Sequence, residues 1–280
     1  MRRRALLGCE MSGRVANEFA KLGWEAVSAD LLPSEMPDTD YRTISSVLND
    51  GDLIDGKPSG SYRHYQGDVR DLFSWDHPVN LRRAREREAA ALPRLRERMP
   101  LWDLAVLFPP CTHLSQAGAV WWKHKDATRG GDGRMQEGAA FFMEMVAAPA
   151  PLVAVENPVG VMCRKPDPGS GRNVGYREPD QVVEPWWFGD PLRKKTCLWL
   201  KGLPLLVADR PVEPLPGGRV ATGGGSWRTD QRHGRGANNG HEDSEGRKMR
   251  QVVRNRTLPG LARAMASQWT VFVEAKEAAA

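Results

Sequence analysis

The sequence predicts an α/β protein, in which helices flank a mostly parallel sheet. Residues 5–30 predict a strand, a glycine-bearing turn, a helix and a second strand that ends in Asp30. Two later apolar segments, 102–108 and 152–155, each lead into a proline and a chemically reactive side chain. Proline has no backbone N–H and cannot extend a ladder, so both segments predict strands that stop there.

The composition favours one large domain with a small appendage. The 280 residues carry 40 Lys+Arg against 35 Asp+Glu, a net charge of +5 that permits a nucleic-acid partner without requiring one. The four cysteines are far apart and form no CxxC pair, which argues against a zinc ribbon and a disulfide scaffold. With neither a signal peptide nor a membrane span predicted, we expect a cytoplasmic protein with reduced thiols and no membrane partner.

The first unit is typical of a nucleotide-binding α/β domain. Strand 5–8 leads into turn 9–13, and apolar residues at helical spacing follow until Gly23 stops the helix. Asp30, at the tip of the second strand, suits the hydroxyls of a ribose. The turn is not GxGxxG, so a nicotinamide fingerprint is missing. A βαβ unit with a chance acid remains an equal alternative.

Segment 31–61 predicts a long loop, and 80–99 predicts a helix rich in Arg and Glu on the surface. Between them, a polar turn at 64–68 ends a third strand. Its Asp68 could accept from an adenine amino group, or it could cap the following turn.

Cys111 follows Pro109 and Pro110 at the end of the strand at 102–108. Rigid backbone would hold this thiol where the ligands of open α/β sheets gather, so it is a candidate nucleophile, with a buried structural cysteine as the alternative. Glu156 ends the next apolar strand, where burial would raise its pKa toward the range useful for proton donation. Parallel strands joined by a helix put both groups on one sheet edge.

Three segments flank these strands. Residues 115–134 combine glycines with aromatic and cationic side chains, which favours a mobile, DNA-facing loop over a core segment. Residues 222–250 contain almost no apolar side chains and predict either a disordered surface loop or, as we prefer, a loop that orders on duplex DNA. Residues 259–272 predict a final helix that packs back on the sheet. We therefore expect a core at 1–200, a loop-rich recognition region at 201–252 and a C-terminal helix region at 253–280.

The order of these motifs resembles the DNA cytosine-C5 methyltransferases. The wording FPPCTHLS, ENPVG, KKTCLWLKGLP and RTLPGLARAMA is most similar to their compact phage-encoded branch, and the resemblance covers nearly the whole chain. It implies a Rossmann-like S-adenosylmethionine-dependent methyltransferase fold with a small, loop-rich DNA-recognition region. It also implies double-stranded DNA as partner, S-adenosylmethionine as cofactor, no metal, and a monomer.

The resemblance assigns roles to residues that match the family's motifs. Cys111 would bond to C6 of a flipped-out cytosine, and Glu156 would bind N3 and the exocyclic amine while C5 takes the methyl group. The residues implied in catalysis are Cys111, Glu156, Asn157 and Lys195. Those implied in cofactor binding are Gly8, Glu10, Ser12, Gly13, Asp30, Asp68, Val69 and Pro109. Those implied in DNA binding are Trp121, Trp122, Lys123, Arg134, Lys194, Trp227, Arg232 and Arg235.

Departures from the family pattern leave alternatives open. Glu10 stands in the usual glycine-rich turn, and Lys194, Lys195 and Thr196 replace the usual Gln-Xaa-Arg-Xaa-Arg element without indicating which of them contacts the base. A transferase acting on adenine N6 or cytosine N4 would need a polar acceptor before Pro-Pro, where this chain has Phe108. Transfer of a different group to C5, or a catalytically inactive DNA-binding relative, remains an alternative.

Overall fold

The computed structural model describes residues 3–35, 62–77, 100–170, 173–214 and 256–279. The predicted helix at 80–99, the recognition loop at 222–250 and most of the loop at 31–61 lie outside the described residues. Within the described part of the chain, no helix is long and apolar enough to cross a membrane.

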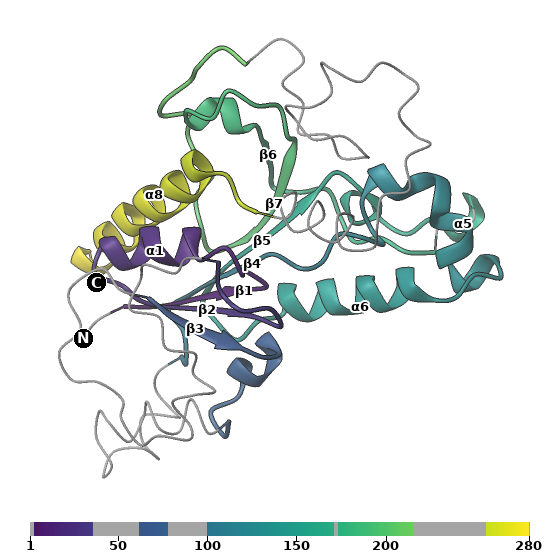
Figure 1. Ribbon diagram of the computed structural model, residues 1–280, viewed down its shortest axis with the longest axis horizontal. Helices are drawn as coiled ribbons and strands as arrows, with labels where there is room; N and C mark the ends of the chain where they lie inside the picture. Colours follow the sequence, from purple (N-terminus) through teal and green to yellow (C-terminus); the bar gives the residue numbers. More distant parts are fainter. Residues whose placement is uncertain (1–2, 36–61, 78–99, 171–172, 215–255, 280) are drawn as a thin grey trace.

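Seven strands form one sheet in the order β3-β2-β1-β4-β5-β7-β6 (Figure 1). All neighbouring strands pair in parallel except β7, which is antiparallel to both β5 and β6. The strands are β1 (Arg4–Gly8), β2 (Glu25–Asp30), β3 (Arg63–Gln66), β4 (Leu104–Leu107), β5 (Leu152–Pro158), β6 (Gln181–Val183) and β7 (Thr196–Lys201). The reversal of strand order between β1 and β4 is that of a doubly wound sheet, and the predicted Rossmann-like α/β fold is confirmed.

Apolar side chains cover both faces of the sheet because the central strands are buried on both sides. In β1, Ala5 and Leu7 face one cluster and Leu6 faces the other. Helices α1 (Arg14–Lys21) and α8 (Pro259–Ala278) lie side by side over the first face, and α6 (Arg134–Val146) packs on the second (Figure 1).

The ends of α1 follow from two glycines. Gly13 precedes the helix with φ of 68° and Gly23 follows it with φ of 84°, a left-handed conformation that costs glycine little. The buried face of α1 includes Val15 and Phe19, as the helical spacing predicts. Trp24 Nε1 then donates to Thr270 Oγ1 at 2.8 Å and ties this unit to α8.

Two predictions about the later strands and loops need correction. β5 does not stop before its proline: it pairs with β4 only to Val155, but continues along β7 through Pro158. Because β7 is antiparallel, it supplies a partner where β4 has already turned away. The segment 115–134 is not an open loop either, since it forms the short helices η2 (Gln116–Trp121), α5 (Trp122–Lys125) and η3 (Ala127–Arg129).

Candidate active site at the strand ends

The carboxyl ends of β1 to β5 and the amino end of β7 meet at one edge of the sheet. β7 runs antiparallel, so Thr196 lies opposite Pro158 and Cys197 lies opposite Asn157. The two lysines just before β7 are thereby brought to the edge where β5 ends. Sequence segments more than 180 residues apart thus converge at this edge, which is where open α/β sheets bind their ligands.

Hydrogen bonds to two backbone carbonyls, those of Pro109 and Cys111, hold the Cys111 loop in place. Asn157 Nδ2 donates to the Pro109 carbonyl at 2.7 Å, and this amide is buried. Beyond the cysteine, the N–H groups of Leu114 and Ser115 both donate to the Cys111 carbonyl, at 3.0 and 2.9 Å. Asn157 therefore positions the start of the loop from the neighbouring strand, while the loop's own turn fixes the backbone of Cys111.

Cys111, Glu156 and Lys194 are coupled electrostatically. Burial raises the pKa of Cys111, and the nearby Glu156 carboxylate raises it further, whereas Lys194 lowers it. Burial also raises the pKa of Glu156, and Lys194 again opposes the shift. Both residues nevertheless keep part of their surface open to solvent. A thiol and a carboxyl are thus desolvated by protein but still within reach of a substrate.

Lys194 and Lys195 occupy different positions at the start of β7. The Lys194 side chain is partly buried, its backbone N–H donates to Glu184 Oε2 at 2.8 Å, and its Nζ approaches the Arg256 carbonyl at 3.5 Å. Lys195 is exposed. The sequence left these two cations undecided, and burial and charge coupling point to Lys194 as the cation of the Cys111–Glu156 pair.

The turn after β1 is shaped by close packing. A Cβ on Gly8 would lie 2.5 Å from Leu107 and 2.6 Å from Val69, so only glycine fits at this strand end. Cys9 then adopts φ of 58°, a backbone conformation that residues other than Gly rarely take. Cys9 is not among the predicted site residues, because its residue type does not indicate a strained backbone.

Glu10 turns inward from this strained turn and is fully desolvated. Its Oε1 accepts from the Ser12 hydroxyl, and the nearby backbone N–H groups of Arg14 and Ala16, at the N-terminus of α1, lower its pKa. Burial is the largest effect and raises the pKa of Glu10 to about 7. Among the described residues, Glu10 Oε2 is buried with no hydrogen-bond partner.

The acids at the ends of β2 and β3 are bound by their own loops. Asp30 Oδ1 accepts from the Leu32 N–H at 2.9 Å. Asp68 caps η1 (Val69–Phe73) by accepting from the Arg70 N–H at 2.9 Å, and the Arg70 guanidinium holds both of its oxygens. Asp68 is therefore the cap that the sequence offered as one of two alternatives, and Arg70 lowers its pKa.

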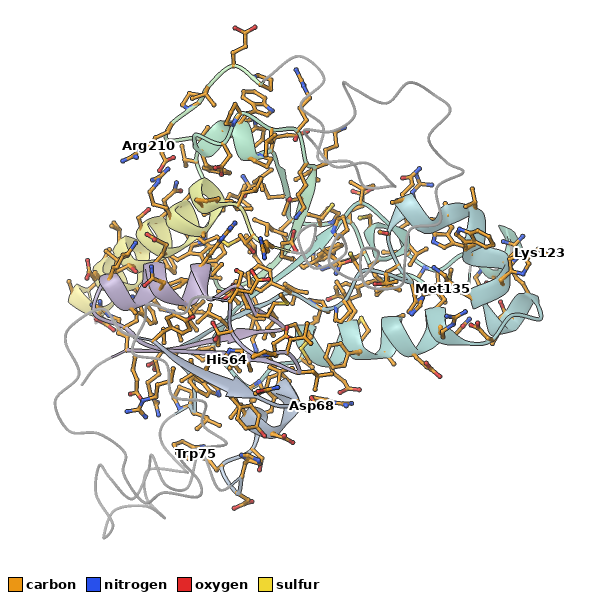
Figure 2. The ribbon with its side chains drawn as sticks, viewed as in Figure 1. His64, Asp68, Trp75, Lys123, Met135 and Arg210 are labelled. Atoms are coloured by element: carbon orange, nitrogen blue, oxygen red, sulfur yellow. The ribbon has the colours of Figure 1, made fainter. Side chains whose placement is uncertain are left out.

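A buried histidine supports the Asp30 loop, and the sequence reasoning did not identify it. His64 Nε2 donates to the Leu32 carbonyl at 2.9 Å, while Nδ1 pairs with the Ser28 hydroxyl at 2.7 Å. Burial lowers the pKa of His64, so its neutral form connects β3, where Figure 2 labels it, to β2 and to the loop after Asp30. In the sequence, only Ser28, a polar residue two positions before Asp30 in an otherwise apolar strand, could have indicated that this strand has a buried polar partner.

The predicted DNA-binding residues separate into three groups. Trp121 is 61% exposed and Lys123 points outward from α5 at the edge of the molecule (Figure 2). Trp122 instead packs against the apolar cluster beneath α6, and Arg134 is paired with Asp132 Oδ2 at 2.7 Å. Of the remaining predicted contacts, Lys194 is partly buried just before β7, and three lie outside the described residues: Trp227, Arg232 and Arg235.

Two observations bear on groups beyond these side chains. Among the residues that the structure describes, no three His, Cys, Asp or Glu side chains are placed to hold a metal ion. The thiols of Cys163 and Cys197 lie 3.6 Å apart, a contact that their 34-residue separation in sequence did not suggest.

No protein-family model matches the chain, and no curated protein does either. Among solved structures, it is similar to a protein described, as a provisional assignment, as a DNA modification methyltransferase encoded within a prophage of E. coli. The identity is 14%, the match covers 71% of this chain, and the TM-score is 0.35. The match covers 46% of that protein, so this chain spans less than half of its length.

Proposed function

We propose that the protein methylates C5 of a flipped-out cytosine in double-stranded DNA through a covalent bond from Cys111 to C6. The observation that carries this proposal is the pairing of Cys111 and Glu156 at one sheet edge, where each is desolvated and coupled to Lys194. C5 of cytosine is a poor nucleophile until a group adds to C6, and a thiolate is well suited to that addition.

The β1 turn fits the proposed cofactor. Glu10 Oε2 is buried without a partner among the described residues, so a bound amine could satisfy it. Asp30 lies at the tip of β2, where a carboxylate can accept from ribose hydroxyls. When bound, S-adenosylmethionine would supply the methyl group for C5. Gly8, Ser12, Gly13, Asp68, Val69 and Pro109 surround the same strand ends and complete the proposed cofactor-binding set.

The chain's own residues would carry the remaining steps. Cys111 loses its proton to solvent, aided by Lys194, and its thiolate forms the Sγ–C6 bond. The electron pair of the C5=C6 bond moves into the ring, and Glu156 donates a proton to N3, which its raised pKa favours. After transfer, C5 loses its proton to solvent, and the electron pair of the C5–H bond restores the C5=C6 bond as the Sγ–C6 bond breaks. N3 returns its proton to Glu156. Cys111 leaves as thiolate.

A duplex must present the base outside its stack for this chemistry. The exposed Trp121 and Lys123 offer a stacking face and a phosphate partner beside the Cys111 loop. Phe108 favours C5 over an amino group as the target, because its apolar side chain cannot accept from an exocyclic amine.

The test is bisulfite sequencing of DNA from cells that express the protein, paired with transfer of labelled methyl from S-adenosylmethionine to duplex DNA in vitro. We expect protected cytosines in one sequence context and label on C5. Cys111→Ser should abolish both signals while DNA binding persists. Full transfer by that variant would refute the covalent route, whereas binding without transfer by the wild type would favour an inactive relative.

A further inference from the structure

Cys163 and Cys197 form a thiol pair next to the candidate active site. Cys163 ends η4 (Val161–Cys163) and is partly exposed, whereas Cys197 is buried on β7 opposite Asn157. Their Sγ atoms are 3.6 Å apart, and a disulfide bond requires about 2.05 Å. A closure of about 1.5 Å would therefore join them.

We propose that Cys163 and Cys197 form a reversible disulfide that controls the position of the Cys111 loop. An oxidised low-molecular-weight disulfide, such as oxidised glutathione, is the oxidant. The Cys163 thiolate attacks one sulfur and releases one equivalent of the small thiol. Cys197 loses its proton and attacks Cys163 Sγ, which forms the protein disulfide and releases the second equivalent. Two protein thiols are oxidised and one small disulfide is reduced to two thiols.

The local environment supports this order of attack. The contact with Cys197 lowers the pKa of Cys163 and raises that of Cys197. Cys163 is also the more accessible of the two. An accessible, acidic thiol with a second thiol behind it has the arrangement of an attacking and a resolving cysteine.

Both thiols lie on elements that hold the Cys111 loop. The turn before Cys163 contacts the loop through Val161 N–H to the Leu114 carbonyl and Gln116 N–H to the Val159 carbonyl, each at 2.9 Å. Gly160 packs so closely on Leu114 that a Cβ there would overlap its carbonyl oxygen.

The other side of the loop is linked to Cys197. Cys197 pairs with Asn157, whose side chain donates to the Pro109 carbonyl at 2.7 Å. Drawing η4 toward β7 would therefore act on the backbone both before and after Cys111. A displacement of about 1 Å at a reacting group can cost about 10²-fold in rate.

The first experiment does not depend on the proposed function. Cys111→Ser protein is treated with oxidised glutathione, digested without reduction and analysed by mass spectrometry. We expect a peptide pair linked through Cys163 and Cys197, lost on reduction and lost in the additional variant Cys163→Ser. If no linked peptide forms, or if Cys9 is linked instead, the proposal is wrong.

The second experiment tests the coupling in protein that retains Cys111. The rate at which iodoacetamide alkylates Cys111 is measured before and after oxidation, with Cys163→Ser as the control for direct oxidation of Cys111. We expect a change of several-fold in the wild type, reversed by dithiothreitol, and none in the control. A linked pair with unchanged Cys111 alkylation would refute control of the loop.

Methyl transfer gives a third measurement, which rests on the proposed function. Oxidation should lower the rate by about 10²-fold in the wild type but leave Cys163→Ser unaffected. If no form of the protein transfers a methyl group, the proposed function fails, while peptide mapping and alkylation still decide the disulfide.

Discussion

At the ends of β1, β2 and β3, acidic side chains are held by hydrogen bonds to their own loops, whereas at β4, β5 and β7 the reactive groups interact mainly through charge. The Arg70 guanidinium donates to Asp68, and the Ser12 hydroxyl donates to Glu10. By contrast, the pKa of the Glu156 carboxyl is raised by burial and lowered by the charge of Lys194.

The two sides of this sheet edge therefore differ in how their polar side chains are held. Hydrogen bonds that are already formed fix the shape of the β1–β3 side, which suits the binding of a cofactor of constant structure. Buried groups with shifted pKa values are costly to maintain and cluster where proton transfer and nucleophilic attack occur. Glu10 on the β1 side is also buried with a raised pKa, but the candidate nucleophile Cys111 lies on the β4–β5–β7 side. Under the proposed function the chemistry would therefore occur on that side, and four predictions test this contrast.

The largest effect is expected for Glu156→Gln. Methyl transfer should fall by about 10²- to 10³-fold, because Gln cannot donate a proton to N3. Alkylation of Cys111 at pH 9 should become faster, because the carboxylate that raises the pKa of Cys111 is gone. Rates of both reactions are compared with those of Glu213→Gln, an exposed control. Slower alkylation in Glu156→Gln would contradict the charge coupling.

Glu10→Gln tests the β1 side through the pH dependence of stability. The folded-state pKa of Glu10, about 7, lies above its ordinary value of 4.5. The contribution of this carboxyl to the free energy of unfolding is therefore fully present below about pH 4.5 and is lost as the pH rises through 7. Relative to the variant, the wild-type free energy of unfolding should fall by about 3 kcal/mol between pH 4 and pH 8. Urea unfolding measures this difference. The exposed Glu137→Gln is the control, and a pH-independent difference for Glu10→Gln would show that this carboxyl is not perturbed.

Trp121→Ala and Trp122→Ala form a matched pair on the α5 segment. Loss of the exposed Trp121 should weaken DNA binding by about 1–3 kcal/mol and leave the free energy of unfolding within about 0.5 kcal/mol. Loss of the packed Trp122 should instead destabilise the fold by at least about 1 kcal/mol. Fluorescence anisotropy and thermal unfolding separate the two. Equal DNA affinity for Trp121→Ala and wild type would remove this tryptophan from the interface.

The smallest effect distinguishes the two lysines at β7. Lys194→Met should slow Cys111 alkylation at pH 8 by a few-fold, since loss of the cation that lowers the pKa of the thiol leaves a smaller fraction as thiolate. Lys195→Met should leave the rate unchanged, because Lys195 is exposed and does not shift the pKa of Cys111. The reverse pattern would assign the catalytic cation to Lys195, as the sequence resemblance first implied.

The five parallel strands, β1 to β5, and the reactive groups after β4 and at the end of β5 could be predicted from the sequence alone. Proline cannot donate to a ladder, and two consecutive prolines after an apolar run ended β4, so Pro109 and Pro110 located Cys111 at a strand end. The α/β class followed from helical and strand periodicities, which are local properties. Two predictions from local pattern were wrong. The strand β5 continued through Glu156 because β7 offered a partner, and the segment 115–134 folded into short helices.

Which of these groups lie close together depends on the tertiary structure. Periodicity encodes the face of an element, but not the direction or neighbours of a strand. The antiparallel insertion of β7 brought Lys194 to Glu156 and placed Cys197 beside Cys163. The positive φ of Cys9, next to the buried Glu10, also belongs to the tertiary structure, because a strained backbone persists only where its surroundings hold it.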